Sequence, residues 1–200
     1  MSAVPGRYAK GVVKRAEILD AALDVLESEG SGGASLRVIA KAADISPAGL
    51  MHYFPTRDML FTELQRDLDL KAEQTYFRGL PHGDPGEVLA AALEGNAARP
   101  AIMELHMMLT IASMNREHPA ADYLRERYAR FADVISAHVE ALQAAGRARS
   151  DIDPRYVAAA LIAAADGIRS QWLHDRSVDM GDHVRRTRRV LLDPSVCGPR

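Results

Sequence analysis

Residues 35–54, SLRVIAKAADISPAGLMHYF, contain two helix starts separated by a tight break. Ser35 can cap a first short helix, and Ser46 with Pro47 can open a second that ends near Tyr53. Small side chains begin the second helix, so its backbone can approach base edges and phosphates, and its positive dipole end favours an anion. This spacing is typical of a helix-turn-helix whose second helix enters the DNA major groove. The spacing alone fits a packed corner of a helical protein equally well.

Positive charge is concentrated near the N-terminus, where Arg7, Lys10, Lys14 and Arg15 all precede the first acidic residue, Glu17. The whole chain of 200 residues has 25 Lys and Arg against 27 Asp and Glu, a formal net charge of -2. Bulk charge therefore gives no indication of nucleic-acid binding, and any basic patch must be local. The N-terminal cations form either such a patch, on phosphates or in the minor groove, or a solvated tail.

A second group of residues has the composition of a small-molecule site. One face of the helix expected over 100–115 carries three thioethers, an imidazole and a hydroxyl: Met103, His106, Met107, Thr110 and Met114. Methionine adapts to irregular apolar shapes, and ligand pockets combine an apolar lining with a few polar groups. An opposing wall is available from Phe131, Ile135, His138 and Trp172, although Trp172 also fits a subunit interface. On these residues alone, an ordinary core stripe with a hydrogen-bonded histidine is the simpler interpretation.

The sequence contains no pattern typical of catalysis, metal binding or a cofactor loop. The seven histidines are dispersed, no two of them at the i, i+4 spacing of a helical zinc pair, and neither G-x-S-x-G nor a phosphate loop occurs. The single Cys197 excludes an internal disulfide and a cysteine zinc cluster. No apolar run approaches the length of about 18–20 residues that a membrane span needs, and the N-terminus lacks a secretory apolar region. We therefore expect a cytoplasmic protein that is not an enzyme, with no metal, no cofactor and no membrane partner.

Apolar residues recur at intervals of three and four, which predicts an all-α protein of about nine helices. The expected helices cover residues 14–29, 35–43, 46–53, 56–77, 84–96, 100–115, 119–145, 153–174 and 182–192, with Asp182 capping the last. The expected division is a three-helix head over residues 1–57 and a larger helical body over residues 58–200.

Residues 14–60 resemble the DNA-binding head of the TetR family of transcriptional regulators. The resemblance is carried by residues 18–22 (ILDAA), 35–40 (SLRVIA), 45–50 (ISPAGL) and 52–60 (HYFPTRDML). Its most specific part is the Tyr-Phe-x-x-Lys/Arg corner that ends the second helix, here completed by Arg57. The remaining length and helix count agree with the ligand-binding and dimerisation body of that family.

The resemblance implies DNA-contacting roles for particular residues. Arg57 corresponds to a phosphate clamp, and His52 and Tyr53 to further phosphate contacts. Since Ala48 and Gly49 have no side chain for a bidentate pair, Arg37 is the candidate for reading a guanine, unless it is only a solvated arginine. The full DNA-binding set is Lys14, Arg37, Ser46, Pro47, Ala48, Gly49, His52, Tyr53 and Arg57.

Two positions depart from the family pattern. Asp44 lies where the turn usually has glycine, and aspartate tolerates the left-handed conformation better than most residues. Met51 lies where many members have a tyrosine that contacts phosphate. One phosphate anchor is therefore expected to be missing.

The segment over residues 154–174 is rich in small residues and apolar around most of its circumference, so it should be buried on more than one side. With the last helix it resembles the four-helix dimer interface of the family. The expected interface residues are Val157, Leu161, Ala164, Ile168, Val184 and Leu191.

Together these patterns predict a homodimeric, ligand-responsive repressor that binds a palindromic double-stranded DNA operator. A small, largely apolar effector, with His106 as its polar anchor, is expected to release it. The alternative is a helical ligand-binding or assembly protein without specific DNA affinity.

Overall fold

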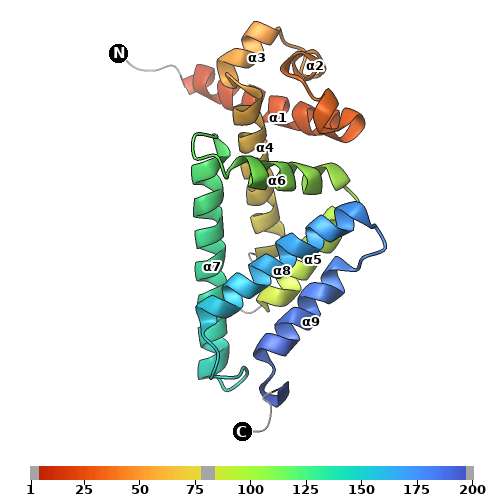
Figure 1. Cartoon of the computed structure of the whole chain (residues 1–200). Helices are drawn as coiled ribbons and strands as arrows, with labels where there is room; N and C mark the ends of the chain where they lie inside the picture. The colour runs from red at the N-terminus through yellow and green to blue at the C-terminus, as the bar shows by residue number, and fades with distance from the viewer. Residues whose placement is uncertain (1–4, 78–83, 197–200) are drawn as a thin grey trace. The chain divides into compact units, whose positions relative to one another are not determined.

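The computed structural model describes residues 5–77 and 84–196, and within them it contains nine α-helices and no strand (Figure 1). The all-α expectation is confirmed. The helices are α1 Pro5–Gly33, α2 Leu36–Ala42, α3 Pro47–Tyr53, α4 Arg57–Ala72, α5 Pro85–Asn96, α6 Pro100–Ala112, α7 Ala120–Ala144, α8 Pro154–His174 and α9 Met180–Leu192. A π-helical turn, η1 Glu73–Phe77, follows α4, and a 3-10 turn, η2 Pro194–Val196, follows α9.

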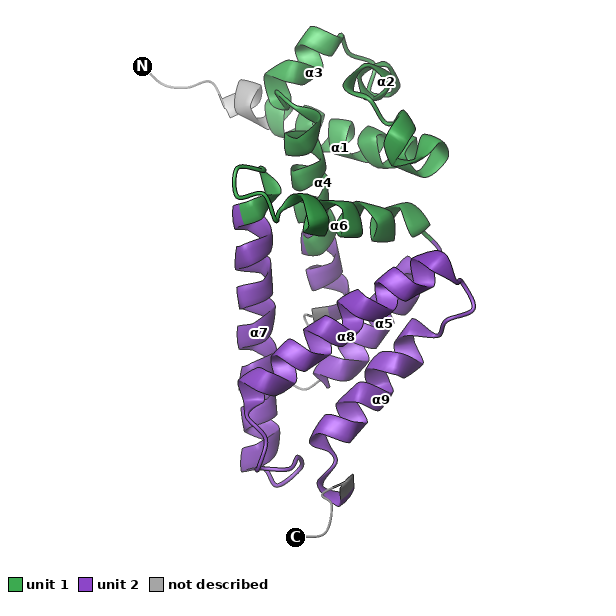
Figure 2. Ribbon diagram, viewed as in Figure 1, with its two compact units in different colours: residues 1–69, 99–121 green, residues 70–98, 122–200 purple. Residues whose placement is uncertain are grey.

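The chain divides into two compact units, drawn in separate colours in Figure 2. Unit 1 comprises residues 1–69 and 99–121, and unit 2 comprises residues 70–98 and 122–200. By compactness, therefore, most of α4 and all of α6 belong with the N-terminal helices. The functional division at residue 57 remains a prediction.

Within unit 1, α2 and α3 are seven residues each, too short to be stable alone in water. Both have the expected serine caps, because Ser35 Oγ accepts a hydrogen bond from the Val38 amide at 3.3 Å and Ser46 Oγ one from Gly49 at 3.0 Å. Each helix buries an apolar side chain completely, Ile39 in α2 and Leu50 in α3. Packing on α1 and on each other therefore supplies the stability that length denies them.

The turn between α2 and α3 depends on Asp44, whose φ of 51° lies in the left-handed region. This conformation lets the Ile45 amide donate back to the Ala40 carbonyl oxygen at 3.0 Å, closing the end of α2. Asp44 is the only non-glycine residue with positive φ in the described part of the chain. The expectation that aspartate replaces the usual glycine in a left-handed turn is confirmed.

Helix α1 begins at Pro5, well before the predicted start at Lys14. Its regular geometry is broken at Gly30, whose φ is 70°, which agrees with the predicted stop at the glycine-rich segment. Ile18, Leu26 and neighbouring apolar residues of α1 are buried, α2 packs on α1, and α3 packs on α2.

Within unit 2, α8 and α9 lie side by side and α5 packs against both (Figure 1). Their core includes apolar side chains of α7, α8 and α9, among them Val139, Leu161 and Leu192. Helix α9 starts earlier than predicted: Asp179, not Asp182, is its cap, and Asp179 Oδ1 accepts from the Asp182 amide at 2.8 Å.

Substituting Asp44 tests the left-handed turn. A β-branched side chain is strained at this φ, so Asp44→Val should lower the free energy of unfolding by about 1–2 kcal/mol. Asp44→Asn should be nearly neutral, because asparagine also adopts this conformation. Urea unfolding of both variants measures the effect, and equal stability of the two would contradict the role given to the turn.

Candidate nucleic-acid interface

The residues expected to face DNA lie largely on the surface of unit 1. Arg37, Ser46, Pro47, Ala48 and His52 are exposed, and Gly49 and Tyr53 are partly so. Side chains of α2 and the start of α3 line an open groove: Glu29, Arg37, Val38, Lys41, Asp44, Ile45, Ser46 and Pro47. The structure therefore brings the candidate guanine reader beside the first turn of the second helix.

A second open groove collects the expected phosphate contacts. It is lined by Lys10, Gly11, Val13, Lys14, Glu17, His52 and Tyr53, so α1 and the end of α3 share it. His52 and Tyr53 meet edge to face, with 5.8 Å between their ring centroids. The aromatic and imidazole groups thus lie next to two lysines, an arrangement suited to a phosphate.

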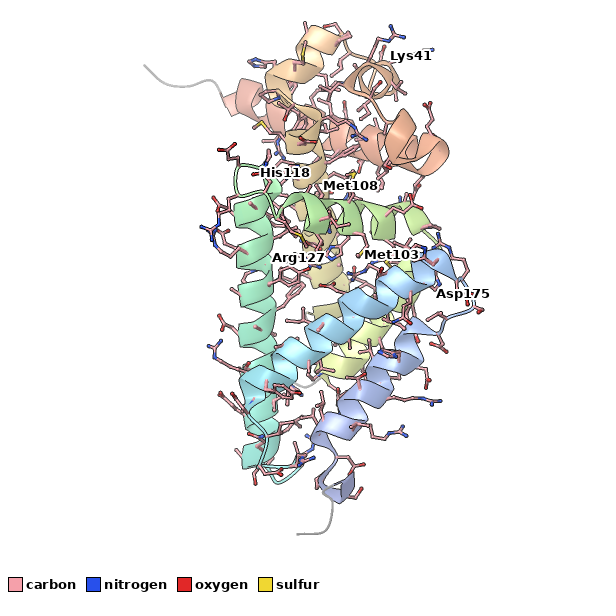
Figure 3. The ribbon with its side chains drawn as sticks, in the orientation of Figure 1. Lys41, Met103, Met108, His118, Arg127 and Asp175 are labelled. Atoms are coloured by element: carbon pink, nitrogen blue, oxygen red, sulfur yellow. The ribbon has the colours of Figure 1, made fainter. Side chains whose placement is uncertain are left out.

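Lys41 is a cation of this surface that the sequence reasoning overlooked. It follows Arg37 by one helical turn on α2 and projects from that helix into solvent (Figure 3). Neither side chain forms an ion pair or a hydrogen bond within the described residues, and both line the first groove. The i, i+4 spacing of the two cations was the available signal.

Arg57, by contrast, is committed inside unit 1. Its Nε donates to the Ala34 carbonyl oxygen at 2.9 Å, and its Nη2 donates to the carbonyl oxygen of Ser31. The guanidinium also stacks on the Phe61 ring, 4.5 Å from its centroid. The cation therefore satisfies one carbonyl group in the last turn of α1 and one just beyond it. These bonds fix the start of α4, whatever contacts the remaining N–H groups of Arg57 make.

Lys14 and Arg15 are also engaged within the unit. Lys14 Nζ pairs with Glu17 at 2.9 Å and donates to the Ala43 carbonyl oxygen at 3.0 Å, at the C-terminal end of α2. A cation at this end complements the negative end of the helix dipole. Arg15 pairs with Glu63 of α4 and lies 4.9 Å from the Phe54 ring centroid. These cations hold the unit together, while Arg37 and Lys41 project outward.

The effector candidates on α6 divide by burial. Met103 and His106 are buried, with 1% and 3% of their surface exposed, whereas Met107 and Thr110 are half-buried. The Thr110 hydroxyl donates to the His106 carbonyl oxygen at 2.8 Å. Met114 does not share the face as expected, because α6 ends at Ala112 and Met114 is 78% exposed beyond it.

The residues that flank α6 connect it to α1 and α4 within unit 1. Arg99, just before α6, hydrogen bonds Glu27 of α1, which raises the pKa of Arg99. His118, on the segment after α6, places Nε2 3.6 Å from Asp58 Oδ2 in the first turn of α4. Since His118 Nδ1 accepts from the Ala120 amide at 3.1 Å, the proton belongs on Nε2, facing that carboxylate.

The remaining effector candidates belong to unit 2. Ile135 is part of its apolar core, and His138 is half-buried. Trp172 is 6% exposed, with the Arg176 guanidinium 3.8 Å from its ring centroid. Phe131 lies against Arg127, 4.6 Å from centroid to guanidinium carbon.

Unit 2 also contains a partly buried polar cluster that the sequence reasoning missed. Asp166 on α8 accepts from the Tyr128 hydroxyl at 2.7 Å and pairs with Arg169 Nη1 at 2.6 Å. Burial lowers the pKa of Arg169, an effect that nearby Arg127 adds to and that Asp166 opposes. Arg169 lies on the helix expected to be apolar around most of its circumference, and the i, i+3 spacing of Asp166 and Arg169 was the only local signal.

The stripe expected at a dimer interface lies in the interior of unit 2. Val157, Leu161, Ile168 and Val184 are at most 4% exposed in the single chain, so they form its own core rather than a face for a second copy. Ala164 and Leu191 are half-buried, and Leu191 packs on the same core. The apolar periodicity correctly predicted burial but assigned it to the wrong contact.

An exposed, serine-capped pair of short helices that packs with α1 as a three-helix head defines a helix-turn-helix DNA-binding regulator, and comparison with known proteins agrees. Residues 18–64 match the model of bacterial regulatory proteins of the tetR family, and residues 86–193 match that of the BetI-type transcriptional repressor C-terminal region. The chain belongs to the TetR family. Regulators of this family are not enzymes, so that expectation is confirmed.

Individual relatives are similar over part or all of the chain. The HTH-type transcriptional regulator BetI of Paraburkholderia phytofirmans is 31% identical over 86 residues, 42% of this chain and 44% of that protein. The chain thus aligns with less than half the length of the curated relatives it matches.

Two solved structures share the fold. A TetR regulator from Haloarcula marismortui has a TM-score of 0.78 at 17% identity, covering 91% of this chain and 100% of that one. The FadR repressor of Thermus thermophilus, solved with lauroyl-CoA, has a TM-score of 0.65 at 20% identity, covering 93% and 96%.

The described residues lack two further features. No helix there is both long and apolar enough to cross a membrane. Nor does any group of three potential metal ligands come together in that part of the chain.

Replacing Arg57 and Arg37 in turn distinguishes a cation that stabilises unit 1 from a cation that recognises a base. Arg57→Ala removes hydrogen bonds from a charged donor, so it should lower the free energy of unfolding by about 1–3 kcal/mol and weaken DNA binding on all sequences alike. Arg37→Ala should leave stability within about 0.5 kcal/mol of the parent. It should instead reduce discrimination at one base pair by about 1–3 kcal/mol.

Urea unfolding and binding to a set of single-base-pair operator variants measure both effects. A uniform loss across the variants for Arg37→Ala would make Arg37 a phosphate contact. An unchanged stability for Arg57→Ala would contradict its supporting role.

Proposed function

We propose that the chain is a homodimeric repressor that binds a palindromic operator through α2 and α3 and is released by a small, largely apolar effector in the cytoplasm. The observation that carries the DNA-binding part is the groove where Arg37 and Lys41 lie beside the exposed first turn of α3. Two such heads related by a two-fold axis require half-sites about 34–36 Å apart, or a multiple of that spacing.

Selection of bound sequences from random DNA tests this function. We expect an enriched palindrome whose affinity falls linearly with the logarithm of salt concentration, and which exceeds that of scrambled DNA by about a thousandfold or more. Failure to enrich any sequence, together with equal affinity for all DNA, would favour the alternative of a helical ligand-binding or assembly protein.

For dimerisation, the exposed side of α8 is the face we propose. Tyr156 is 61% exposed, and Ala159, Ala163 and Gly167 follow it on the same side of the helix, all of them exposed. Small side chains at successive turns allow a second helix to approach closely. A Cβ added at Gly167 would meet nothing within 4 Å, so this surface has room inside the single chain.

Ala163→Arg should convert the dimer into a folded monomer, because it places a charge at a close helix contact without disturbing the core of unit 2. The matched control is Ala137→Arg, an exposed alanine of α7 rather than of α8, which should remain dimeric. Light scattering measures the mass and circular dichroism the fold. A dimeric Ala163→Arg variant would remove α8 from the interface.

The effector is proposed to act through α6, because α6 belongs to the same unit as the DNA-binding helices and is tied to α1 and α4. Met103 and Met107 supply adaptable apolar contacts and His106 a polar anchor. The FadR repressor of Thermus thermophilus, which shares this fold, was solved with lauroyl-CoA, a ligand that carries a long apolar acyl chain. Effector and operator must then weaken each other by the same factor, with a coupling of about 1–3 kcal/mol.

Removing the contact between His118 and Asp58 should reduce this coupling. With a compound that stabilises the parent in a thermal-shift panel of apolar metabolites, His118→Ala should bind the compound normally but release DNA less. Glu117→Ala, an exposed neighbour, is the control and should couple like the parent. Full coupling in His118→Ala would exclude the contact from signal transmission, and compounds that bind the parent without changing operator affinity would refute the effector proposal.

A further inference from the structure

The exposed face of α3 has few hydrogen-bonding side chains. Pro47, Ala48 and Met51 lie on it at offsets of zero, one and four, and none of these side chains carries a hydrogen-bond donor. His52 is the only fully exposed donor-bearing side chain of α3, and Tyr53, the last residue of the helix, is partly exposed. A helix in this position therefore has little with which to recognise guanine or adenine through its own side chains.

Met51 dominates this apolar face. It is 47% exposed, whereas the preceding residue, Leu50, is completely buried and fills the core beneath α3. The helix therefore already has its core anchor, and the thioether of Met51 is directed to the side that would meet DNA. With exposed Pro47 and Ala48, Met51 makes this side of α3 a contiguous apolar patch, and such a patch within a polar surface marks a contact with an apolar group of a partner.

The major groove offers one such group. Each A·T pair presents the C5 methyl of thymine there, and apolar side chains distinguish thymine by contact with that methyl. Methionine is flexible and polarisable, so it can adapt to a methyl group at slightly different positions. Arg37 and Lys41, beside the first turn of α3, provide the charge that holds the face against the duplex.

We propose that Met51, with Pro47 and Ala48, forms a thymine-methyl-reading face on α3. This inference rests on the proposed DNA-binding function and names how part of its specificity arises. Each operator half-site then carries thymine at a position facing Met51, on either strand. Burial of one methyl group contributes about 0.8 kcal/mol, which is about a fourfold change in affinity per half-site and about fifteenfold per palindrome.

The test replaces thymine with uracil in the operator obtained by selection from random DNA. Deoxyuridine keeps every hydrogen bond of thymidine and lacks only the C5 methyl. Symmetric dT→dU replacement, one position at a time, should weaken the parent about fourfold per half-site at one or two positions. Met51→Ala should bind the thymine operator more weakly and should lose the discrimination at those positions.

Met59→Ala is the matched control, since Met59 is also an exposed methionine, 40% exposed, but lies on α4. It should keep the full preference for thymine over uracil. Unfolding curves of both variants should match the parent because both side chains are exposed.

Two outcomes would overturn the inference: equal binding of the thymine and uracil operators by the parent, or a thymine preference that persists unchanged in Met51→Ala. Either result is obtained with an operator that the protein binds specifically, so the proposed function would stand. Absence of any enriched operator would instead count against the proposed function, and the inference would fall with it.

Discussion

The DNA-binding unit depends on the shortness of α2 and α3. Helices of seven residues are not stable in water unless they pack on other parts of the protein. Helix α1 supplies that support with buried residues such as Ile18 and Leu26. Leu50 of α3 is also completely buried and anchors that helix in the same unit. Because the core side of each short helix is filled completely, the opposite side is left free for recognition. The same constraint explains why the turn at Asp44 is so tightly specified.

Positive charge in this unit has two separate uses. Lys14 and Arg57 donate to carbonyl oxygens at Ala43 and Ala34, where they close the ends of α2 and α1. Arg37, Lys41 and His52 are exposed. A phosphate-contacting role and a supporting role can look identical in the sequence, since both need a cation near a helix end. Their consequences differ, because removal of a supporting cation weakens all binding by loosening the unit.

Local signals predicted most of the fold. Ser35, Ser46 and Asp153 cap helices as expected, because a cap depends only on the next few residues. Long-range features were less accessible. The stripe through Val157 and Leu161 is buried as expected, but apolar periodicity does not say whether the covering surface belongs to the same chain. Met114 lies off its predicted face because α6 ends at Ala112. No proline or glycine marks this end in the sequence, so the prediction extended the helix too far. Arg57 contacts Ala34, and His118 contacts Asp58, across long stretches of the sequence. No local sequence pattern predicts contacts of this kind.

Hydrogen–deuterium exchange with and without the selected operator tests the central claim most directly, namely that α2 and α3 form the DNA-binding surface. The account predicts that operator binding slows exchange in residues 36–53 and in the part of α1 that carries Lys10 and Lys14, because these backbones become covered and their opening is suppressed. Exchange that slows elsewhere in the chain while residues 36–53 stay unchanged would contradict it.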